Sequence, residues 1–268
     1  MALPPASKET TVLITGASSG IGAELARELA ARGHGVTLVA RRAERLEELA
    51  RELEGAYGTT ASVVPCDLSD PDARAALMDG LLAEGPALAG LCNNAGFGMN
   101  GLVRENDADR ERQMVELNID ALHDLTLRAL PGMVERSSGA ILNVASTAAF
   151  QPLPYFATYG ATKAFVLSFT EGLSHELGGT GVSATALCPG PVKTEFAEVA
   201  GSAGFEDAMP SFAFVDARDV ARAAVEGMVK GSRTVIPGKA NWVQAQAGRI
   251  SPRAITLRLS EQMGRGGS

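Results

Sequence analysis

Two tyrosines and one lysine lie close together in the segment "PYFATYGATKAF", residues 154–165, where they could carry out proton chemistry. A phenol has an ordinary pKa of about 10, and a nearby cation lowers that pKa towards the range in which acid–base catalysis is efficient. Residues four apart on a helix share a face, which brings Lys163 beside Tyr159. Tyr155 is two turns from the lysine, about 12 Å along the axis. The spacing therefore predicts Tyr159 as the acid/base group and Tyr155 as part of a pocket wall.

A glycine-rich turn, "TGASSGIG", occupies residues 15–22, between an apolar β-type run and a helical pattern. Glycine permits a tight turn and a close approach of the backbone to a ligand, and the helix N-terminus offers free N–H groups to a pyrophosphate. This position between strand and helix predicts a dinucleotide site. Its spacing, G-x-x-x-G-x-G, ends at Gly22. The expected contacts are Gly16, Ser18, Ser19, Gly20 and Ile21.

The segment "LVARR", at the end of the second predicted strand, indicates which dinucleotide binds. An NAD site usually has an acidic residue at this point, which accepts hydrogen bonds from the ribose hydroxyls. Here Ala40 is followed by Arg41 and Arg42, and guanidinium groups suit a 2′-phosphate. We therefore predict NADP(H) as the coenzyme. The alternative is that both arginines only begin the solvated face of the next helix.

The segment "CDL" ends the third predicted strand and could contact the adenine. Asp67 could accept a hydrogen bond from the adenine amino group, with Leu68 beside it. The alternative for Asp67 is a helix N-cap, but Ser69 and Asp70, just before Pro71, are better placed for that role. The sequence therefore predicts Asp67 and Leu68 as coenzyme contacts.

The residues from 189 to 216 follow the sixth predicted strand. In "PGPVKT", backbone groups around Val192 and the hydroxyl of Thr194 could contact the nicotinamide carboxamide and the pyrophosphate, because ligands bind at this edge of a parallel sheet. Residues 195–216 mix small residues, aromatic residues and glycine, which predicts a flap over a site. An ordinary surface loop with a short helix is the alternative.

Short apolar runs alternate with helical patterns along most of the chain. This alternation predicts an α/β fold with a single doubly wound Rossmann-type parallel sheet of about seven strands and helices on both faces. The expected strands are 10–16, 35–40, 61–68, 88–96, 139–146, 181–190 and 233–238. The expected helices are 22–33, 43–54, one between 68 and 88, 107–130 and 155–177.

Two terminal segments flank the catalytic domain expected at 10–238. Residues 1–9 are predicted to be a flexible arm. Residues 239–268 form a tail in which apolar residues alternate with arginines, as in a short amphipathic helix. We expect the tail to pack on its own domain or on a partner subunit, and contact with a membrane surface is a further alternative.

Composition excludes some classes of function. The chain has 268 residues and a net charge of -7, which argues against nucleic-acid binding. No apolar run approaches the roughly 20 residues of a membrane span, and the first residues do not resemble a signal peptide, so the cytoplasm is the expected location. Cys66, Cys92 and Cys188 are expected to be buried and reduced, and the three histidines lack metal-ligand spacing, so no metal is predicted.

Six motifs in order make the chain similar to a known family, the short-chain dehydrogenases/reductases in their single-domain form. The resemblance runs from Thr10 to about Gly238, and the tail after Gly238 departs from the family's common ending. The motifs are "TGASSGIG" at 15–22, "NNAG" at 93–96, Asn118 in "ELNID", Ser146 in "NVAST", "YGATK" at 159–163 and "PGPVKT" at 189–194.

The resemblance implies roles for four residues. Tyr159 is the general acid/base, and Lys163 also binds the nicotinamide ribose. Ser146 hydrogen-bonds the substrate oxygen and stabilises charge that develops there. Asn118 holds a water in a proton relay through Lys163. Without the other motifs, Tyr159 and Lys163 could equally form a partly exposed helix face.

The resemblance also implies coenzyme contacts in "NNAG" and a common mode of assembly. The coenzyme contacts would be Asn93, Asn94 and Ala95. Members of the family are commonly dimers or tetramers built through two helices, which correspond to 107–130 and 155–177 here. A homodimer or homotetramer is therefore expected.

Apolar residues dominate the expected substrate pocket, so we predict a hydrophobic ketone or secondary alcohol as substrate. The alternative is that these residues pack only against neighbouring loops. A non-catalytic NADP(H)-sensing protein is the main rival function, and a nucleotide-sugar epimerase or dehydratase is a second. The expected pocket residues are Phe97, Met99, Phe150, Leu153, Tyr155, Phe196, Phe205 and Phe212.

Overall fold

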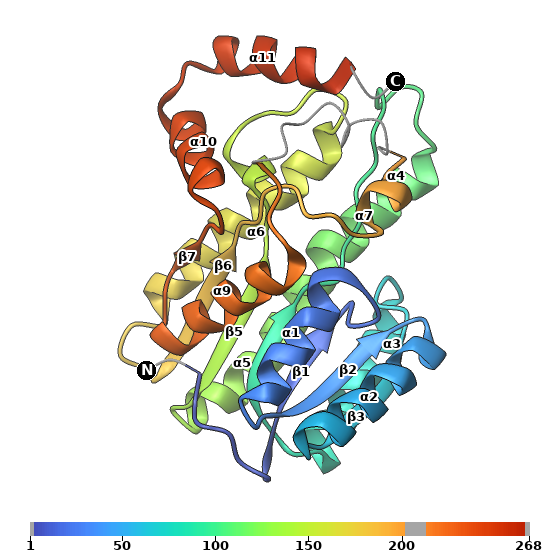
Figure 1. Ribbon diagram of the computed structural model, residues 1–268, viewed down its shortest axis with the longest axis vertical. Helices are drawn as coiled ribbons and strands as arrows, with labels where there is room; N and C mark the ends of the chain where they lie inside the picture. The colour runs from blue at the N-terminus through green and yellow to red at the C-terminus, as the bar shows by residue number, and fades with distance from the viewer. Residues whose placement is uncertain (1–2, 202–212, 266–268) are drawn as a thin grey trace.

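The computed structural model describes residues 3–201 and 213–265, and in this part of the chain seven parallel strands form one sheet (Figure 1). Their order is β3-β2-β1-β4-β5-β6-β7, so the chain starts in the middle and winds outward in both directions. This confirms the predicted doubly wound fold. The strands are β1 (Thr10–Thr15), β2 (Gly35–Ala40), β3 (Ala61–Pro65), β4 (Ala87–Asn93), β5 (Gly139–Val144), β6 (Val182–Leu187) and β7 (Thr234–Val235).

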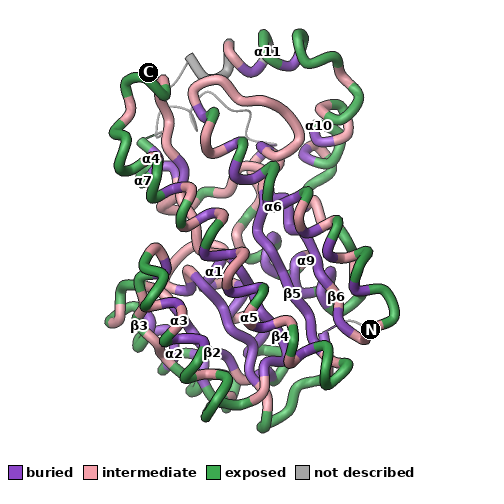
Figure 2. Tube along the Cα trace, turned by 180° about the vertical axis from the view of Figure 1, so that it is seen from behind, coloured by how far each residue is buried: buried purple, intermediate pink, exposed green. Residues whose placement is uncertain are grey.

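Helices cover both faces of the sheet, as predicted. Side chains of α1 (Gly20–Ala31), α2 (Ala43–Tyr57) and α9 (Ala217–Lys230) pack on one face. On the opposite face, α3 (Pro71–Glu84), α5 (Leu122–Glu135) and α6 (Ala157–Glu176) form a second apolar layer. The central strands are therefore buried along almost their whole length (Figure 2), which explains their continuous apolar sequences.

The helix expected at 107–130 is divided into three parts. A first segment, α4 (Ala108–Val115), leads into a π-helical turn, Glu116–Ala121, which then continues into α5. The wider turn carries the candidate relay residue, Asn118, and single π turns are frequent at functional sites. The helical sequence pattern predicted one continuous helix and did not mark this turn.

The N-terminal segment is anchored, which differs from the expected loose arm. Leu3 is buried in the core on the α9 side of the sheet, and its backbone N–H donates to the carbonyl of Met228 at 2.9 Å. A Cβ on Gly90 of β4 would lie 3.2 Å from the Leu3 side chain. The small residue in the strand therefore makes room for the arm.

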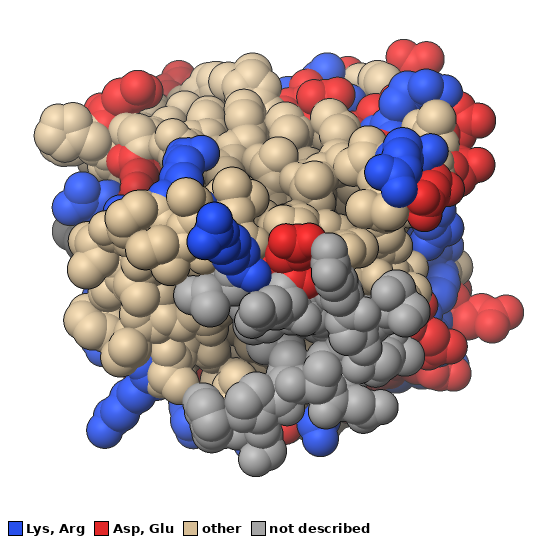
Figure 3. All heavy atoms as spheres, turned by 90° about the horizontal axis from the view of Figure 1, so that it is seen from above, with Lys and Arg blue, Asp and Glu red and all other residues tan. Residues whose placement is uncertain are grey.

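The C-terminal tail forms two helices, α10 (Lys239–Ile250) and α11 (Arg253–Arg265), at one end of the molecule. Buried Asn241 attaches α10 to the domain, because its amide donates to the carbonyls of Ala213 and Pro237. Figure 3 looks onto this end, where uncharged side chains form much of the surface. Among the described residues, no helix combines the length and apolar character needed to cross a membrane.

Candidate active site

A cavity of about 540 Å³ opens at the carboxyl ends of the strands. Its walls come from the β1–α1 turn, the ends of β2, β4 and β5, helix α6 and the segment after β6. Most residues predicted for the site therefore meet around one space, although they come from separate elements. Those that line it are Gly16, Ser18, Ser19, Gly20, Ile21, Arg41, Arg42, Asp67, Leu68, Asn94, Ala95, Ser146, Tyr159, Lys163, Val192 and Thr194.

The β1–α1 turn has the backbone shape that a phosphate site requires. Gly16 and Gly20 have φ values of 66° and 56°, in the left-handed region that glycine tolerates best. A Cβ on Gly22 would lie 2.2 Å from the Gly16 carbonyl oxygen, so only glycine fits there. Helix α1 begins without a side-chain cap and without an acidic residue in its first turn. Its first N–H groups are therefore suited to a pyrophosphate.

Positive charge borders this turn. The guanidinium of Arg42 donates to the hydroxyl oxygens of Ser18 and Ser19 at 3.0 and 2.9 Å, so it lies against the glycine turn. Arg41 also lines the cavity. Strand β2 ends on Ala40, so no carboxylate occupies the strand end itself. These features fit a dinucleotide that carries a 2′-phosphate.

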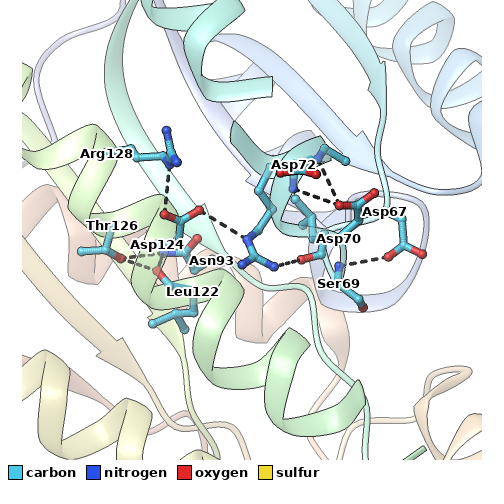
Figure 4. Close-up of polar contacts among 12 residues, drawn as sticks. Asp67, Ser69, Asp70, Asp72, Asn93, Leu122, Asp124, Thr126 and Arg128 are labelled. Atoms are coloured by element: carbon cyan, nitrogen blue, oxygen red, sulfur yellow. Dashed lines mark hydrogen bonds and ion pairs between the residues drawn. The ribbon is translucent and has the colours of Figure 1, made fainter. Parts of the chain in front are cut away.

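The segment between β3 and α3 forms the next part of the wall (Figure 4). The carboxylate of Asp67 accepts a hydrogen bond from the Ser69 backbone at 3.0 Å. Asp70 caps α3 by accepting from backbone N–H groups in its first turn, as predicted. Arg74 is buried and donates to the carbonyl of Leu68 at 2.7 Å, which fixes the wall from behind.

Tyr159 and Ser146 form the centre of the candidate catalytic group. Tyr159 lies in α6, and its phenol lies near the hydroxyl of Ser146, which follows β5 and favours the phenolate. Ser146 also accepts from the backbone N–H of Ala148 at 3.1 Å, which holds its side chain in place. Burial raises the pKa of Tyr159 to about 12, and the nearby hydroxyl of Ser146 only partly offsets it. The nucleotide-free protein therefore holds a neutral phenol.

Lys163 follows Tyr159 by one turn, as the spacing predicts, but its interaction differs from the expected one. The ammonium donates to the carbonyl of Val144 at 2.8 Å and lies 5.8 Å from the centre of the Tyr159 ring. Burial lowers the pKa of Lys163 to about 8. The lysine was expected to lower the pKa of the phenol, but in this structure the pKa of Tyr159 is raised. Loss of water is the largest cause of the shift in both groups.

Asn118 lies beneath the catalytic group and does not line the cavity. Its amide donates to the Phe97 carbonyl at 2.9 Å and to the Thr162 hydroxyl at 3.0 Å, while its oxygen accepts from the Phe97 backbone. A Cβ on Gly96 would lie 2.8 Å from that oxygen and 3.5 Å from the Lys163 ammonium. Asn118 thus holds the chain after β4 close to Lys163.

Asn93 differs from the coenzyme role expected of it. It is buried, does not line the cavity and belongs to a polar network between β4, β5, α5 and α6. Its amide donates to Asn143 at 2.9 Å and to Thr126 at 3.0 Å, and Asn143 donates to Thr170 at 3.0 Å (the bond to Thr126 is drawn in Figure 4). The neighbouring Asn94 and Ala95 do line the cavity. Asn93 therefore connects layers of the fold.

The apolar end of the cavity contains only part of the expected set. Phe97, Leu153 and Phe196 line it, with the Phe196 ring centre 5.4 Å from that of Tyr159. Phe150 lines a second cavity between α6 and the C-terminal helices instead. Met99 and Tyr155 line neither cavity, and Phe205 and Phe212 lie outside the described residues.

Tyr155 precedes α6, which starts at Ala157, two residues later than expected. Its φ is 69°, in the left-handed region that non-glycine residues rarely adopt, and its carbonyl accepts from the Gly101 backbone at 2.8 Å. The argument from a shared helix face therefore does not apply to Tyr155. Tyr159 is the tyrosine that meets Lys163.

The residues that line the cavity without having been singled out from the sequence include Arg110, Glu195, Gln244 and Ser260. Arg110 lies over the Phe97 ring, 5.3 Å from its centre, and donates to the Val199 carbonyl at 3.1 Å. It brings a positive charge to a pocket that was expected to carry almost none. Gln244 and Ser260 come from α10 and α11, so the tail covers the site. No local pattern marks these residues, because distant elements bring them in.

The comparison with protein families identifies the family to which this chain belongs. The model of short chain dehydrogenases matches residues 10–204. The chain belongs to the short-chain dehydrogenase family. It is 39% identical over 191 residues to the NADP-dependent 3-hydroxy acid dehydrogenase YdfG of Escherichia coli, covering 70% of this chain and 75% of the relative.

Solved structures of this family agree with that assignment. A short-chain dehydrogenase from Sphingobium yanoikuyae in complex with NADPH aligns with a TM-score of 0.81 and 34% identity, over 90% of this chain and 93% of that chain. The bulky-bulky ketone specific alcohol dehydrogenase from Comamonas testosteroni aligns with a TM-score of 0.76 and 31% identity, over 89% and 91%. The chain is therefore a short-chain dehydrogenase in fold and in sequence.

We expect Asn93→Ala to reduce stability without weakening nucleotide binding. The substitution leaves the buried oxygen of Asn143 without its donor, which costs roughly 1–3 kcal/mol. Urea unfolding should therefore show a lower midpoint, while calorimetric titration with NADPH gives an unchanged affinity for the folded protein. Asn94→Ala is the comparison, since Asn94 lines the cavity. A large loss of NADPH affinity in Asn93→Ala would restore the coenzyme role.

We expect the phenol of Tyr159 to stay protonated until about pH 12 in the nucleotide-free protein, because burial disfavours the phenolate. The raised pKa contributes stability that is complete below about pH 10, the value of a free phenol, and is lost as the pH rises through the folded value. The measurement is the phenolate absorbance of wild type minus Tyr159→Phe against pH. Tyr155→Phe serves as the control. A difference signal that develops below pH 10 would contradict the effect of burial.

Proposed function

We propose that this protein is an NADP(H)-dependent oxidoreductase that interconverts a hydrophobic ketone and a secondary alcohol. The observation that carries the proposal is the position of Tyr159. Its phenol lies near Ser146, its ring contacts Phe196 at the apolar end, and its helix brings Lys163 to the same cavity. One side of that cavity has the features of a dinucleotide site. A proton donor thus lies where the two halves meet.

The coenzyme supplies the hydride when bound, and the protein supplies the proton. In the direction of reduction, the neutral phenol of Tyr159 would protonate the carbonyl oxygen as the alcohol forms. Ser146, whose hydroxyl lies beside the phenol, donates a hydrogen bond to the substrate oxygen as negative charge develops on it. Lys163 returns a proton towards the phenolate that remains, and its lowered pKa makes that transfer easier.

Asn118 has a positioning role in this proposal. Its amide nitrogen and oxygen both bond residues of its surroundings, so it fixes the backbone beside Lys163. The water that the resemblance assigns to Asn118 remains a prediction.

Several observations support NADP(H) over NAD(H). Two arginines line the cavity beside the glycine turn, and β2 ends without an acid. The Escherichia coli relative is named NADP-dependent, and the Sphingobium structure is a complex with NADPH.

The apolar end of the cavity supports a hydrophobic carbonyl substrate. Phe97, Leu153, Phe156 and Phe196 line it, and the Comamonas relative is described as specific for bulky-bulky ketones. The Arg110 guanidinium at this end adds a possible partner for an anionic group on the substrate. The substrate class therefore includes apolar ketones with or without a carboxylate at the far end.

Exposed apolar side chains on α5 and α6 support a homo-oligomer. Leu127 and Phe165 are 52% and 38% exposed, and the Phe165 ring stacks on Phe169 with centres 5.9 Å apart. Such a surface is suited to a second copy of the chain.

Purified protein should oxidise NADPH in the presence of ketones, with kcat/KM rising with the apolar size of the ketone. Tyr159→Phe should lose at least about 100-fold in kcat, the usual contribution of a general acid. The decrease in NADPH absorbance at fixed pH measures the kcat/KM of each ketone and the kcat of the variant. Arg110→Ala should lower turnover only of ketones that end in a carboxylate. Binding of NADPH without turnover of any ketone would favour the sensing function instead.

The pH dependence should carry a descending limb from Lys163. Because its pKa is lowered to about 8, the ammonium is present below that pH and lost above it, so kcat/KM for NADPH in ketone reduction should fall above about pH 8. Lys163→Arg keeps its charge throughout this range. Its residual activity should lack the limb. If wild type and Lys163→Arg both lose activity above the same pH, the descending limb belongs to a group other than Lys163.

A further inference from the structure

Glu195 connects two arginines across the nucleotide end of the cavity. One carboxylate oxygen accepts from Arg42 at 2.9 Å, and the other accepts from Arg45 at 2.5 Å. The arginines lie at the start of α2, whereas Glu195 follows β6, about 150 residues later in the chain. These two hydrogen bonds hold the pKa of Glu195 at about 2, so it is an anion at any physiological pH.

The same guanidinium faces the glycine turn. Arg42 bonds Ser18 and Ser19 with one part of its fork and Glu195 with another. Arg42, Glu195 and both serines line the same cavity. A carboxylate therefore occupies the position next to the phosphate-binding turn that a phosphate of the ligand would need. All three charged side chains are more than 40% exposed, so water screens these ion pairs and they can exchange.

The next residue reaches the catalytic group. Phe196 begins the short helix α7 (Phe196–Val199) and packs against the Tyr159 ring. A Cβ on Gly98 would lie 2.9 Å from the tip of the Phe196 ring, so the contact is close. The far end of the segment is held as well, because the carbonyl of Ala200 accepts from the Asn100 backbone at 2.9 Å. Residues 195–200 thus connect the arginines with the substrate end.

We infer that Glu195 is an internal competitor for the 2′-phosphate site: it occupies Arg42 and Arg45 until a phosphate displaces it, and its release frees the segment 195–200 beside Tyr159. This inference rests on the proposed NADP(H) function. A phosphate carries more charge and more acceptor oxygens than a carboxylate. It therefore binds the two arginines more strongly than Glu195 does and displaces it. A dinucleotide without the 2′-phosphate leaves the Glu195 contacts in place. Glu195 therefore determines how strongly the two coenzymes are distinguished.

The test measures calorimetric affinities for 2′-phospho-ADP-ribose and for ADP-ribose, which differ only in the phosphate. Glu195→Gln removes the competing charge at nearly constant size. It should bind 2′-phospho-ADP-ribose roughly two- to tenfold more tightly than wild type, the range expected from losing two exposed ion pairs. Its affinity for ADP-ribose should not change. The gain should shrink at high salt, because salt screens the competing ion pairs.

Glu198→Gln is the matched control, since Glu198 lies exposed in α7, three residues after Glu195, and carries the same charge. It should bind both ligands as wild type does. An unchanged or weaker affinity of Glu195→Gln for 2′-phospho-ADP-ribose would overturn the inference, and so would an equal gain for both ligands. The wild-type preference between the two ligands tests the coenzyme assignment separately.

A separate experiment, backbone hydrogen exchange, tests whether Glu195 restrains the segment beside Tyr159. In ligand-free Glu195→Gln, the backbone amides of Phe196–Ala200 should exchange hydrogen faster than in wild type, because one end of the segment is no longer held. Glu198→Gln should leave that exchange unchanged. Equal exchange rates in Glu195→Gln and wild type would overturn the coupling.

Discussion

The ends of β1 and β4 meet at the point where the sheet reverses its winding, and this contact positions the whole site. The hydroxyl of Thr15 accepts from the backbone N–H groups of Asn94 and Ala95 at 2.9 and 3.0 Å. In return, the amide of Asn94 donates to the Thr15 carbonyl at 2.9 Å. These bonds connect the last residue of β1 with the chain that follows β4. They place the glycine turn and the segment leading to Phe97 on opposite sides of one opening.

Close packing follows from this contact. A Cβ on Gly16 would lie 2.9 Å from the Asn94 amide, and one on Gly22 would lie 2.6 Å from it. The glycines therefore serve two demands: they shape the turn for a phosphate and admit the Asn94 side chain. The same principle recurs at Gly96, where the missing side chain leaves room for Asn118 and Lys163. Glycine at these positions reflects contacts between strands as much as contacts with a ligand.

The fold was predictable because its signals are local. Apolar runs, glycine turns and helical patterns each occupy about ten residues, and their alternation determines a parallel sheet. The pairing of Tyr159 with Lys163 could be predicted for the same reason, because the two residues are only four positions apart. The anchoring of Leu3 and the bridge from Glu195 to Arg42 could not be predicted, because each joins residues far apart in sequence. The π turn at Asn118 is local, but the helical pattern of residues 107–130 did not separate it from the helices on either side. Asn93 belongs to a motif associated with the coenzyme, and only the three-dimensional network separates its role from that of Asn94.

The four-residue spacing of Tyr159 and Lys163 also could not predict how burial changes their pKa values. A lysine one turn from a tyrosine suggests attraction between charges, which would lower the pKa of the phenol. In the folded chain, both groups lose water, and burial favours the neutral form of each. The phenol then keeps its proton while the ammonium holds its proton less firmly. These opposite shifts move the two pKa values apart, to about 12 for the phenol and about 8 for the ammonium. The neutral phenol can donate its proton to a carbonyl oxygen, and the lysine can then return a proton to the phenolate. The burial that excludes water from the pocket therefore also sets both groups in the protonation states that this transfer needs.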